Sequence, residues 1–273
     1  MTARDPDASR RGAEDVPASW SDLERELDAW AAAGRRATFW WRDDDAVEPS
    51  VELDRLIDLA GTARVVPALA VIPAHASGAL ADRLRSAPGS GSPCAVLQHG
   101  YAHHNHAVGT KSELGSERPL SIRLDELRRG EMRLKKLFGA CAMPVLVPPW
   151  NRIAGDLLPA LPSIGFVGIS VYRARRSAQA APGLRIANTH VDIVDWRGGR
   201  KFVGAGAALG LAVGHLAARR TGMADGAEPT GLLTHHLVHD EPCWNFMRRL
   251  LDETRKHPAA HWLAPPDVFE VHA

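Results

Sequence analysis

The sequence predicts an α/β fold built around a parallel β-sheet, and three observations point to it. Seven short apolar runs with strand character recur along the chain, segments with helical periodicity lie between most of them, and polar clusters follow several of the runs. Alternating strands and helices favour a parallel sheet. The pattern by itself fits either a barrel or an open doubly wound sheet, and both place chemistry at the carboxyl ends of the strands.

The individual elements follow from local patterns. The first helix is expected to begin at Ser21, because Ser21-Asp-Leu-Glu24 has the form of a capping box, and to end at Gly34. A second helix is expected from Pro49 to Gly61, with proline near its start and glycine past its end. Further helices are predicted over 78–86, 121–138, 204–220 and 242–257. Strands are predicted over 37–41, 65–72, 94–98, 144–148, 165–171, 184–194 and 231–235.

The chain is expected to form one domain over residues 20–273. The charged stretch 1–19 has no apolar run and is expected to be a disordered leader. Two segments rich in small or polar residues, 87–93 and 173–183, are expected to be loops.

The composition excludes several classes of protein. The 33 Lys and Arg residues balance 32 Asp and Glu residues without a basic block, so no nucleic-acid partner is expected. No apolar stretch suits a secretory signal or a membrane span. Three distant cysteines (Cys94, Cys141 and Cys243) have no CxxC spacing, which indicates a reducing cytoplasm. Nothing indicates an oligomeric state.

Metal-ligand and acid–base residue types gather where the predicted strands end. Because parallel strands end at one rim, these side chains are expected to converge. The clusters are Arg42-Asp43-Asp44-Asp45 after the first strand, His99 and His103 after the third, Pro149-Trp150-Asn151 after the fourth, Asp192, Asp195 and Trp196 near the sixth, and His235-His236 after the seventh.

Two of these histidines suggest a metal centre. His99 and His103 have i, i+4 spacing, which places two imidazoles on one side of a helical turn. Imidazoles suit a divalent ion such as zinc, and one carboxylate from the Asp run would complete a three-ligand site. A bound ion would activate water, a second carboxylate would act as general base, and a histidine from the opposite loop would act as general acid. These are the parts of a metal-assisted hydrolase.

The order of these motifs resembles that of the polysaccharide deacetylase (NodB-homology) superfamily, which includes carbohydrate esterase family 4, over residues ~37–257. The resemblance implies a distorted (β/α) barrel of about seven parallel strands. It also implies a divalent metal held by Asp-His-His and hydrolysis of N-acetyl groups on amino sugars. Zinc is the expected ion, with cobalt, nickel and manganese as alternatives.

The resemblance assigns roles to the first two motifs. Asp44 would be the base and Asp45 a metal ligand, together with His99 and His103; the alternative register makes Asp43 the base and Asp44 the ligand.

The third motif departs from the family's pattern. Pro149 and Trp150 match it, but Val147 stands where the family has an arginine that positions the base. We therefore predict that Arg42, beside the Asp run, supplies that charge.

The last two motifs would provide the acid. In the family the aspartate before the tryptophan of Asp192-Ile-Val-Asp195-Trp196 tunes the acid histidine, so Asp195 takes that role here. His235 is the expected acid, and His236 is its rival. The residues expected to contact substrate are Arg42, Asp43, Pro149, Trp150, Asn151, Trp196 and His236.

The sequence thus predicts a metal-dependent hydrolase of C–N amide bonds, a deacetylase of amino sugars or glycans. The missing signal peptide argues against an extracellular polymer, so a small non-sugar amide is an alternative substrate. A catalytically inactive carbohydrate-binding or regulatory protein is the alternative from another class, supported by the missing arginine.

Overall fold

The computed structural model describes residues 16–86 and 95–271. The expected leader lies mostly outside these ranges, and the loop expected over 87–93 lies wholly outside them.

The α-helices are α1 (Trp20–Ala32), α2 (Val51–Ala63), α3 (Gly78–Arg85), α4 (Leu120–Phe138), α5 (Ala205–Thr221), α6 (Glu241–Lys256) and α7 (Pro265–Phe269). The strands are β1 (Ala37–Ala46), β2 (Ala68–Val71), β3 (Ala95–His99), β4 (Ala142–Val147), β5 (Gly168–Ile169), β6 (Gln179–Ala181), β7 (Leu184–Ile186), β8 (Val191–Asp192), β9 (Val194–Asp195), β10 (Lys201–Phe202), β11 (Thr230–Thr234) and β12 (Ala260–Trp262). Short 3₁₀ helices are η2 (Pro73–His75), η3 (Gly139–Cys141), η4 (Pro149–Asn151), η5 (Leu158–Ile164) and η6 (His236–Val238).

One sheet occupies the centre of the molecule. Its strands lie in the order β6-β7-β5-β4-β3-β2-β1-β11-β8, and β12 also pairs with β1. Every pairing in it is parallel except that of β6 with β7. The predicted α/β fold with a parallel sheet is therefore confirmed, and the polar clusters at the carboxyl ends of β1, β3, β4 and β11 lie at one rim.

The segment 184–192 curls this sheet into a distorted barrel. Its first part, β7, pairs with β5, and its last part, β8, pairs with β11. Between them the Thr189 N–H donates to the Val171 carbonyl (3.0 Å), and the His190 N–H donates to the Gly231 carbonyl (2.7 Å). This segment thus joins the two sides of the sheet. The single strand predicted over 184–194 is wrong, because the range is divided among β7, β8 and β9, and β9 pairs with β10 in a separate small sheet.

The barrel interior is layered along β1. Alternate residues of a strand point to opposite faces, so Trp40, Arg42 and Asp44 share the inner face. Phe269 of α7 meets the Trp40 ring edge-on, with ring centroids 5.6 Å apart. The neighbours of Trp40 in this inner cluster are mostly small or branched side chains, including Ala68, Ala70, Ala95, Leu97, Val145, Val147 and Ala187. This apolar floor lies below the charged layer of Arg42 and Asp44.

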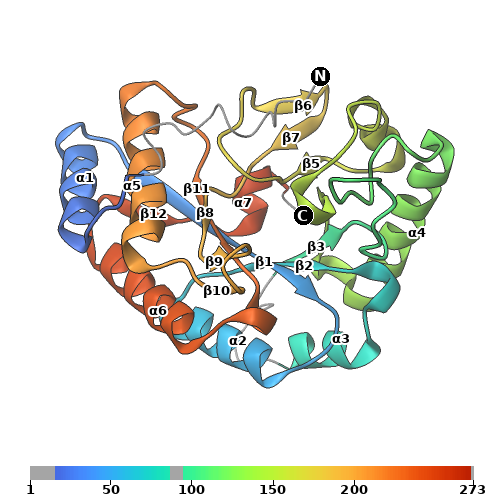
Figure 1. Ribbon diagram of the computed structural model, residues 1–273, viewed down its shortest axis with the longest axis horizontal. Coiled ribbons are helices and arrows are strands. Elements are labelled where there is room, and N and C mark those ends of the chain that lie inside the picture. The colour runs from blue at the N-terminus through green and yellow to red at the C-terminus, as the bar shows by residue number, and fades with distance from the viewer. Residues whose placement is uncertain (1–15, 87–94, 272–273) are drawn as a thin grey trace.

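Helices surround the barrel and bury the outer faces of the strands. In Figure 1, α1 and α5 lie on the left of the strands, α6, α2 and α3 below them, and α4 on the right. Phe39 and Trp41 of β1 pack with apolar residues of these helices in the largest core cluster. Trp41 is completely buried, and replacing such a side chain by alanine costs about 3–5 kcal/mol.

The N-cap of helix α1 lies two residues earlier than the serine expected to cap it. Its N-cap is Ser19, whose hydroxyl accepts from the Asp22 N–H (3.3 Å), while the Asp22 carboxylate accepts from the Ser19 N–H (2.8 Å). The chain carries the same serine-to-acid spacing at 19–22 and at 21–24, and the earlier one forms the capping box. The box predicted at Ser21 is therefore wrong.

Two further expectations need correction. Helix α2 continues past Gly61 because Ala63 is buried against the core, and it ends where Arg64 adopts a left-handed φ of 52°. Residues 173–183 are not entirely a loop, since β6 forms within them and pairs antiparallel with β7.

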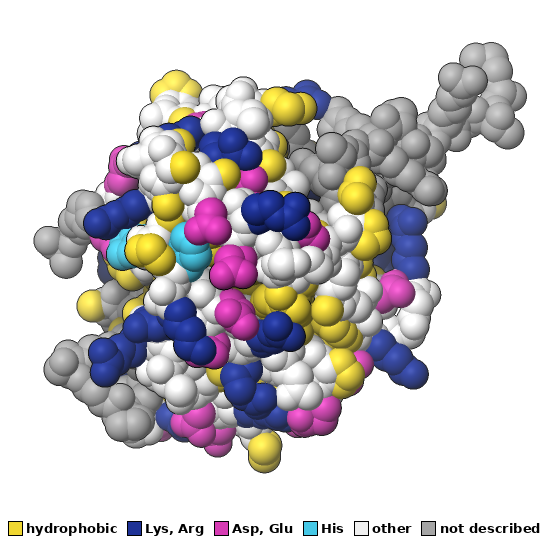
Figure 2. All heavy atoms as spheres, turned by 90° about the vertical axis from the view of Figure 1, so that its left-hand side faces the viewer, with side chains coloured by type: hydrophobic (Ala, Val, Ile, Leu, Met, Phe, Trp, Pro, Cys, Tyr) yellow, Lys and Arg dark blue, Asp and Glu magenta, His cyan; other side chains and the backbone are white. Residues whose placement is uncertain are grey.

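The surface carries both signs of charge. On the face that Figure 2 shows, basic and acidic side chains are interspersed. Across residues 16–86 and 95–271, none of the helices combines the length and the apolar character needed to cross a lipid bilayer.

Candidate active site

The three aspartates at the end of β1 occupy three different environments. The ladder between β1 and β2 shifts register between Asp44 and Ala46, and Asp45 has a positive φ of 74°. Such an irregularity re-aims the side chain it carries. Asp43 and Asp44 are buried, whereas the Asp45 side chain is 35% exposed at the rim.

The two histidines of the predicted metal motif lie side by side. His99 ends β3, and the chain then turns through Gly100 and His103, which both have φ near +56°. Their ring centroids are 5.0 Å apart, with the planes tilted by 46°. The expected helical turn is therefore wrong, although the two imidazoles do lie together.

Asp45 brings a carboxylate to these rings. Its Oδ1 atom lies 3.1 Å from His99 Nε2 and 3.5 Å from His103 Nε2, and the three ligand atoms lie within 4.8 Å of one another. His99 Nδ1–H donates to the Val147 carbonyl (2.9 Å), which leaves the lone pair on Nε2. Asp45 Oδ1 is buried without a hydrogen-bond partner. A divalent ion that prefers nitrogen and oxygen ligands, such as zinc, fits this set.

The three residues differ in their electrostatics. Burial opposes protonation of His99, but contact with Asp45 and the nearby Asp44 raise its pKa above the usual value, so a bound ion would have to displace a proton from this ring. Burial by itself would raise the pKa of Asp45, but contact with His99 and the nearby His235 and His103 lower it below its usual range. Burial and the neighbouring His99 lower the pKa of His103. Asp45 is therefore ionised and His103 is neutral at pH 7, as metal ligation requires.

A second cluster of ligand-type residues does not fit a metal. Atoms of His190, His215 and Glu228 also lie within 4.8 Å of one another. However, His190 Nδ1 accepts from the Gly231 N–H (2.9 Å), so the neutral ring carries its proton on Nε2. The two rings stack with centroids 3.4 Å apart and planes 15° apart, so one ion cannot lie close to both rings and in both planes. Burial, Arg219 and Arg175 keep the pKa of His190 well below its usual value, so this buried imidazole is neutral at pH 7.

Arg42 holds Asp44 from inside the barrel. Its Nε donates to Asp44 Oδ1 (2.8 Å) and its NH2 donates to Oδ2 (3.0 Å), with both side chains at most 3% exposed. The guanidinium also donates to Ser170 Oγ (2.6 Å) and Asn151 Oδ1 (2.9 Å). This bidentate pair is the contact expected of an arginine that compensates for Val147.

His235 faces Asp44 from the end of β11. Its Nε2 lies 4.0 Å from Asp44 Oδ2. The Trp196 ring packs on it with centroids 4.6 Å apart, and Trp196 Nε1–H donates to Asp192 Oδ2 (2.9 Å). Burial raises the pKa of Asp192, and the nearby His235 opposes that shift. Asp192 thus interacts with His235, as Asp44 and Asp45 do from β1.

Asp195 does not occupy the tuning position that the resemblance implies. Its Oδ1 accepts the backbone N–H groups of Arg197 (3.1 Å) and Gly198 (2.7 Å), so it caps the turn between β9 and β10. Asp192 is nearer to the acid candidate because β8 pairs with β11, which places Asp192 opposite Leu233.

Asp43 and His236 form a buried pair below the site. His236 Nδ1 bonds Asp43 Oδ1, the His236 N–H donates to Oδ2 (3.0 Å), and the Thr234 hydroxyl donates to the same oxygen (2.6 Å). Burial opposes protonation of His236, but Asp43 raises its pKa above the usual value. Neither side chain is exposed, so the substrate contacts expected of both are wrong in this structure, and His235 is the histidine that faces Asp44.

The third motif divides into inward and outward residues. Pro149 is buried against Gly100, and Asn151 directs its carbonyl to Arg42. Trp150 has a positive φ of 56°, and its ring lies 4.3 Å from that of His103. Because Arg42 and Pro149 are also buried, Trp150 and the 42% exposed Trp196 remain the residues placed to contact a substrate.

Two neighbours of the site had no role assigned to them from the sequence, where His239 fits a residue beside the site as well as one on the surface. Ser170, which accepts a hydrogen bond from Arg42, lies near the end of the apolar run 165–171. Its polarity within that run is the one feature of the sequence that could have indicated a role. His239 accepts the His235 N–H through Nε2 (3.2 Å), and burial lowers its pKa to about 4.

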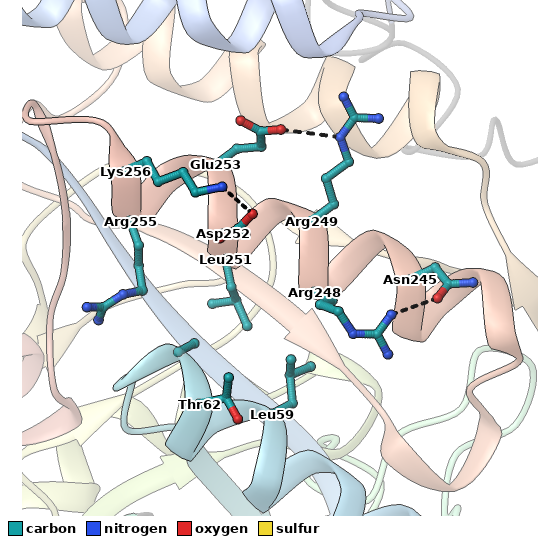
Figure 3. Close-up of a pocket in the computed structure, with 11 residues that line it drawn as sticks. Leu59, Thr62, Asn245, Arg248, Arg249, Leu251, Asp252, Glu253, Arg255 and Lys256 are labelled. Carbon is teal, nitrogen blue, oxygen red and sulfur yellow. Dashed lines mark hydrogen bonds and ion pairs between the residues drawn. The ribbon is translucent and has the colours of Figure 1, made fainter.

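A large surface groove of about 800 Å³ lies elsewhere, between α2 and α6. Figure 3 shows that its charged side chains pair along α6, with Arg249 on Glu253 and Lys256 on Asp252. It includes none of the candidate site residues.

Comparisons with known proteins agree with this architecture. No family model matches the chain, and no curated protein matches it by sequence. Among solved structures, a putative polysaccharide deacetylase from Mycobacterium smegmatis superposes with a TM-score of 0.63 at 16% identity, covering 93% of this chain and 92% of that one. A Streptococcus mutans CE4 esterase gives 0.55 at 12% identity (92% and 93% covered), and a chitin deacetylase from Colletotrichum lindemuthianum gives 0.51 at 16% identity (86% and 88% covered). The resemblance found in the sequence thus extends to the whole architecture, and the chain has the fold of the carbohydrate esterase family 4 polysaccharide deacetylases.

Proposed function

We propose that this protein is a divalent-metal-dependent hydrolase of carbon–nitrogen amide bonds, and that it removes acetyl groups from N-acetylated amino sugars or glycans. The observation that carries the proposal is one rim where Asp45, His99 and His103 converge beside an Arg42-held Asp44. The fold adds support, since the similar structures include a chitin deacetylase.

Asp45, His99 and His103 would hold the ion, with zinc expected and cobalt, nickel or manganese as alternatives. When bound, the ion supplies Lewis acidity that polarises the amide carbonyl and acidifies a water molecule. Asp44 then accepts the proton of the attacking water. Arg42 keeps the Asp44 oxygens oriented for this transfer, which is the role of the arginine that Val147 replaces.

His235 completes the acid–base pair. Its Nε2 lies 4.0 Å from Asp44 Oδ2, so the two groups border the same position in the site. His235 donates a proton to the departing amine, which would otherwise be a poor leaving group. Trp150 and Trp196 offer ring faces on which a pyranose can stack.

A metal and acetate-release assay tests the proposal. The purified protein is analysed for bound metal, stripped with a chelator and reloaded with Zn²⁺ or Co²⁺, and acetate release is followed from N-acetylated sugars. Activity is expected to vanish on stripping and to return on reloading. Asp45→Asn should abolish it, while Asp195→Asn, the same change at the β9–β10 turn, should retain it. Activity that survives both chelation and Asp45→Asn would refute the mechanism.

The substrate panel decides between the alternatives. If small non-sugar acetamides are hydrolysed and N-acetylated sugars are not, the proposed substrate class is wrong, but the proposed metal-dependent hydrolysis stands. Sugar binding without turnover of any acetamide would indicate a binding protein instead of an enzyme.

A further inference from the structure

The turn that joins the two proposed imidazole ligands is held by a carboxylate from outside it. Glu113 is 1% exposed. Its Oε2 accepts the Tyr101 N–H (3.0 Å), and its Oε1 accepts the N–H groups of Ala102 (2.8 Å) and His104 (3.4 Å). Buried backbone N–H groups without an acceptor are costly, so this carboxylate satisfies a turn that has no regular secondary structure.

Glu113 is itself fixed by the protein core. Its neighbour Leu114 is completely buried and forms an isolated β-bridge with Ile153. The Arg118 guanidinium donates to the Glu113 carbonyl (3.0 Å). The carboxylate therefore has a position set by packing, and the turn adapts to it.

The sequence of the turn is fitted to this carboxylate. Gly100 has a positive φ of 56°, and a Cβ atom there would lie 1.9 Å from Glu113 Oε2 and 2.6 Å from Pro149 Cγ. Only glycine allows the carboxylate to approach the backbone so closely. The tight approach brings the chain round so that His103 returns to His99.

We propose that Glu113 is a positioning residue for the metal centre, holding the 100–104 turn in the shape that presents His103 beside His99 and Asp45. The inference rests on the proposed function for its metal and goes beyond it in assigning Glu113. Hydrogen bonds to ligand-bearing segments commonly decide how well a metal site is preorganised. A buried negative charge near the site also favours a cation.

Two measurements on the full-length protein test the role. Co²⁺ affinity is measured by isothermal titration calorimetry, and exchange of the Tyr101 and Ala102 amides is measured in the metal-free protein. Glu113→Gln replaces one acceptor oxygen by an NH₂ group that faces N–H donors. It is expected to weaken Co²⁺ binding about 10–100-fold and to speed exchange of those amides at least about tenfold. The matched control Glu117→Gln makes the same change at an exposed position four residues away and should alter neither.

Glu113→Asp tests whether the length of the side chain matters as well as its charge, because it keeps the carboxylate and shortens the side chain by one methylene group. Weak Co²⁺ binding by both variants, with circular dichroism and thermal midpoints close to those of the control, supports positioning by the hydrogen-bonded carboxylate. Wild-type affinity and wild-type amide protection in Glu113→Gln would overturn the inference. If the wild-type protein binds no Co²⁺, the proposed function fails, and amide exchange alone then decides whether Glu113 orders the turn.

Discussion

Replacing Arg42 tests directly whether this arginine holds the proposed base, Asp44. Arg42→Met keeps the aliphatic stem and removes the guanidinium, leaving Asp44 as a buried carboxylate without its two charged donors. Removing one partner of a buried ion pair costs about 3–5 kcal/mol. At roughly 2–4 °C per kcal/mol for a chain of this size, the melting temperature should fall by roughly 6–20 °C.

A double-mutant cycle isolates the pair itself. Arg42→Met and Asp44→Asn are each expected to destabilise the protein, whereas the double variant removes both buried charges. Its destabilisation should therefore fall short of the sum by about 2–3 kcal/mol, measured by urea unfolding at pH 7. Arg42→Lys keeps the charge but not the two-pronged geometry, so kcat should fall about 100-fold while Co²⁺ affinity stays near wild type.

An exposed pair provides the control. Lys256 and Asp252 lie 2.6 Å apart on the surface of α6, and the same cycle there should show no measurable coupling. Additive effects at Arg42 and Asp44, together with an unchanged kcat in Arg42→Lys, would refute the argument that this arginine holds the base.

Three other predictions concern the metal, the acid and the core. Loss of a residue that only supports a metal ligand typically weakens metal binding about 10–100-fold. His103→Ala should weaken Co²⁺ binding by more than that, as measured by equilibrium dialysis, and unchanged affinity would show that His103 is not a ligand. Asp192→Ala removes the acceptor of Trp196 Nε1–H and so loosens the ring that packs on His235; it should lower kcat about tenfold in steady-state assays, and an unchanged kcat would contradict this positioning role. Burial, with His190 and Arg219, lowers the pKa of His215 to about 2 from 6.5, so its contribution to stability is present above pH 6.5 and is lost as pH falls. Stability to urea should therefore drop by about 1.4 kcal/mol per pH unit for this group below pH 6.5, and His215→Phe should flatten that slope.

Local patterns were sufficient for the longer elements and for their order, but they did not predict the short elements β6, β10, β12 and α7. The helical periodicity of 121–138 and 204–220 and the apolar runs at 37–41 and 231–235 are encoded by neighbouring residues, and the elements formed there within a few residues. The errors lie at ends and connections, where patterns compete. Ser19 and Ser21 both offer a capping box, and only packing of α1 selects one.

The residue types of the candidate site were also readable, because parallel strands bring the residues beyond their carboxyl ends to one rim. Asp45, His99 and His103 converge as that argument requires, and Arg42 lies against Asp44 as the missing motif arginine led us to expect. Two predicted substrate contacts failed because the side chains point the other way: Asp43 and His236 face the core and pair with each other.

By itself the sequence determined a parallel α/β chain with carboxylates and imidazoles at its strand ends, because strand and helix periods and residue chemistry are local properties. Only the tertiary structure decided which aspartate reaches the rim, that Asp192 and not Asp195 neighbours His235, and that Glu113 holds the turn between the imidazoles. Those choices depend on a register shift in β1, on the pairing of β8 with β11 and on contacts between segments distant along the chain. No short window of sequence encodes them.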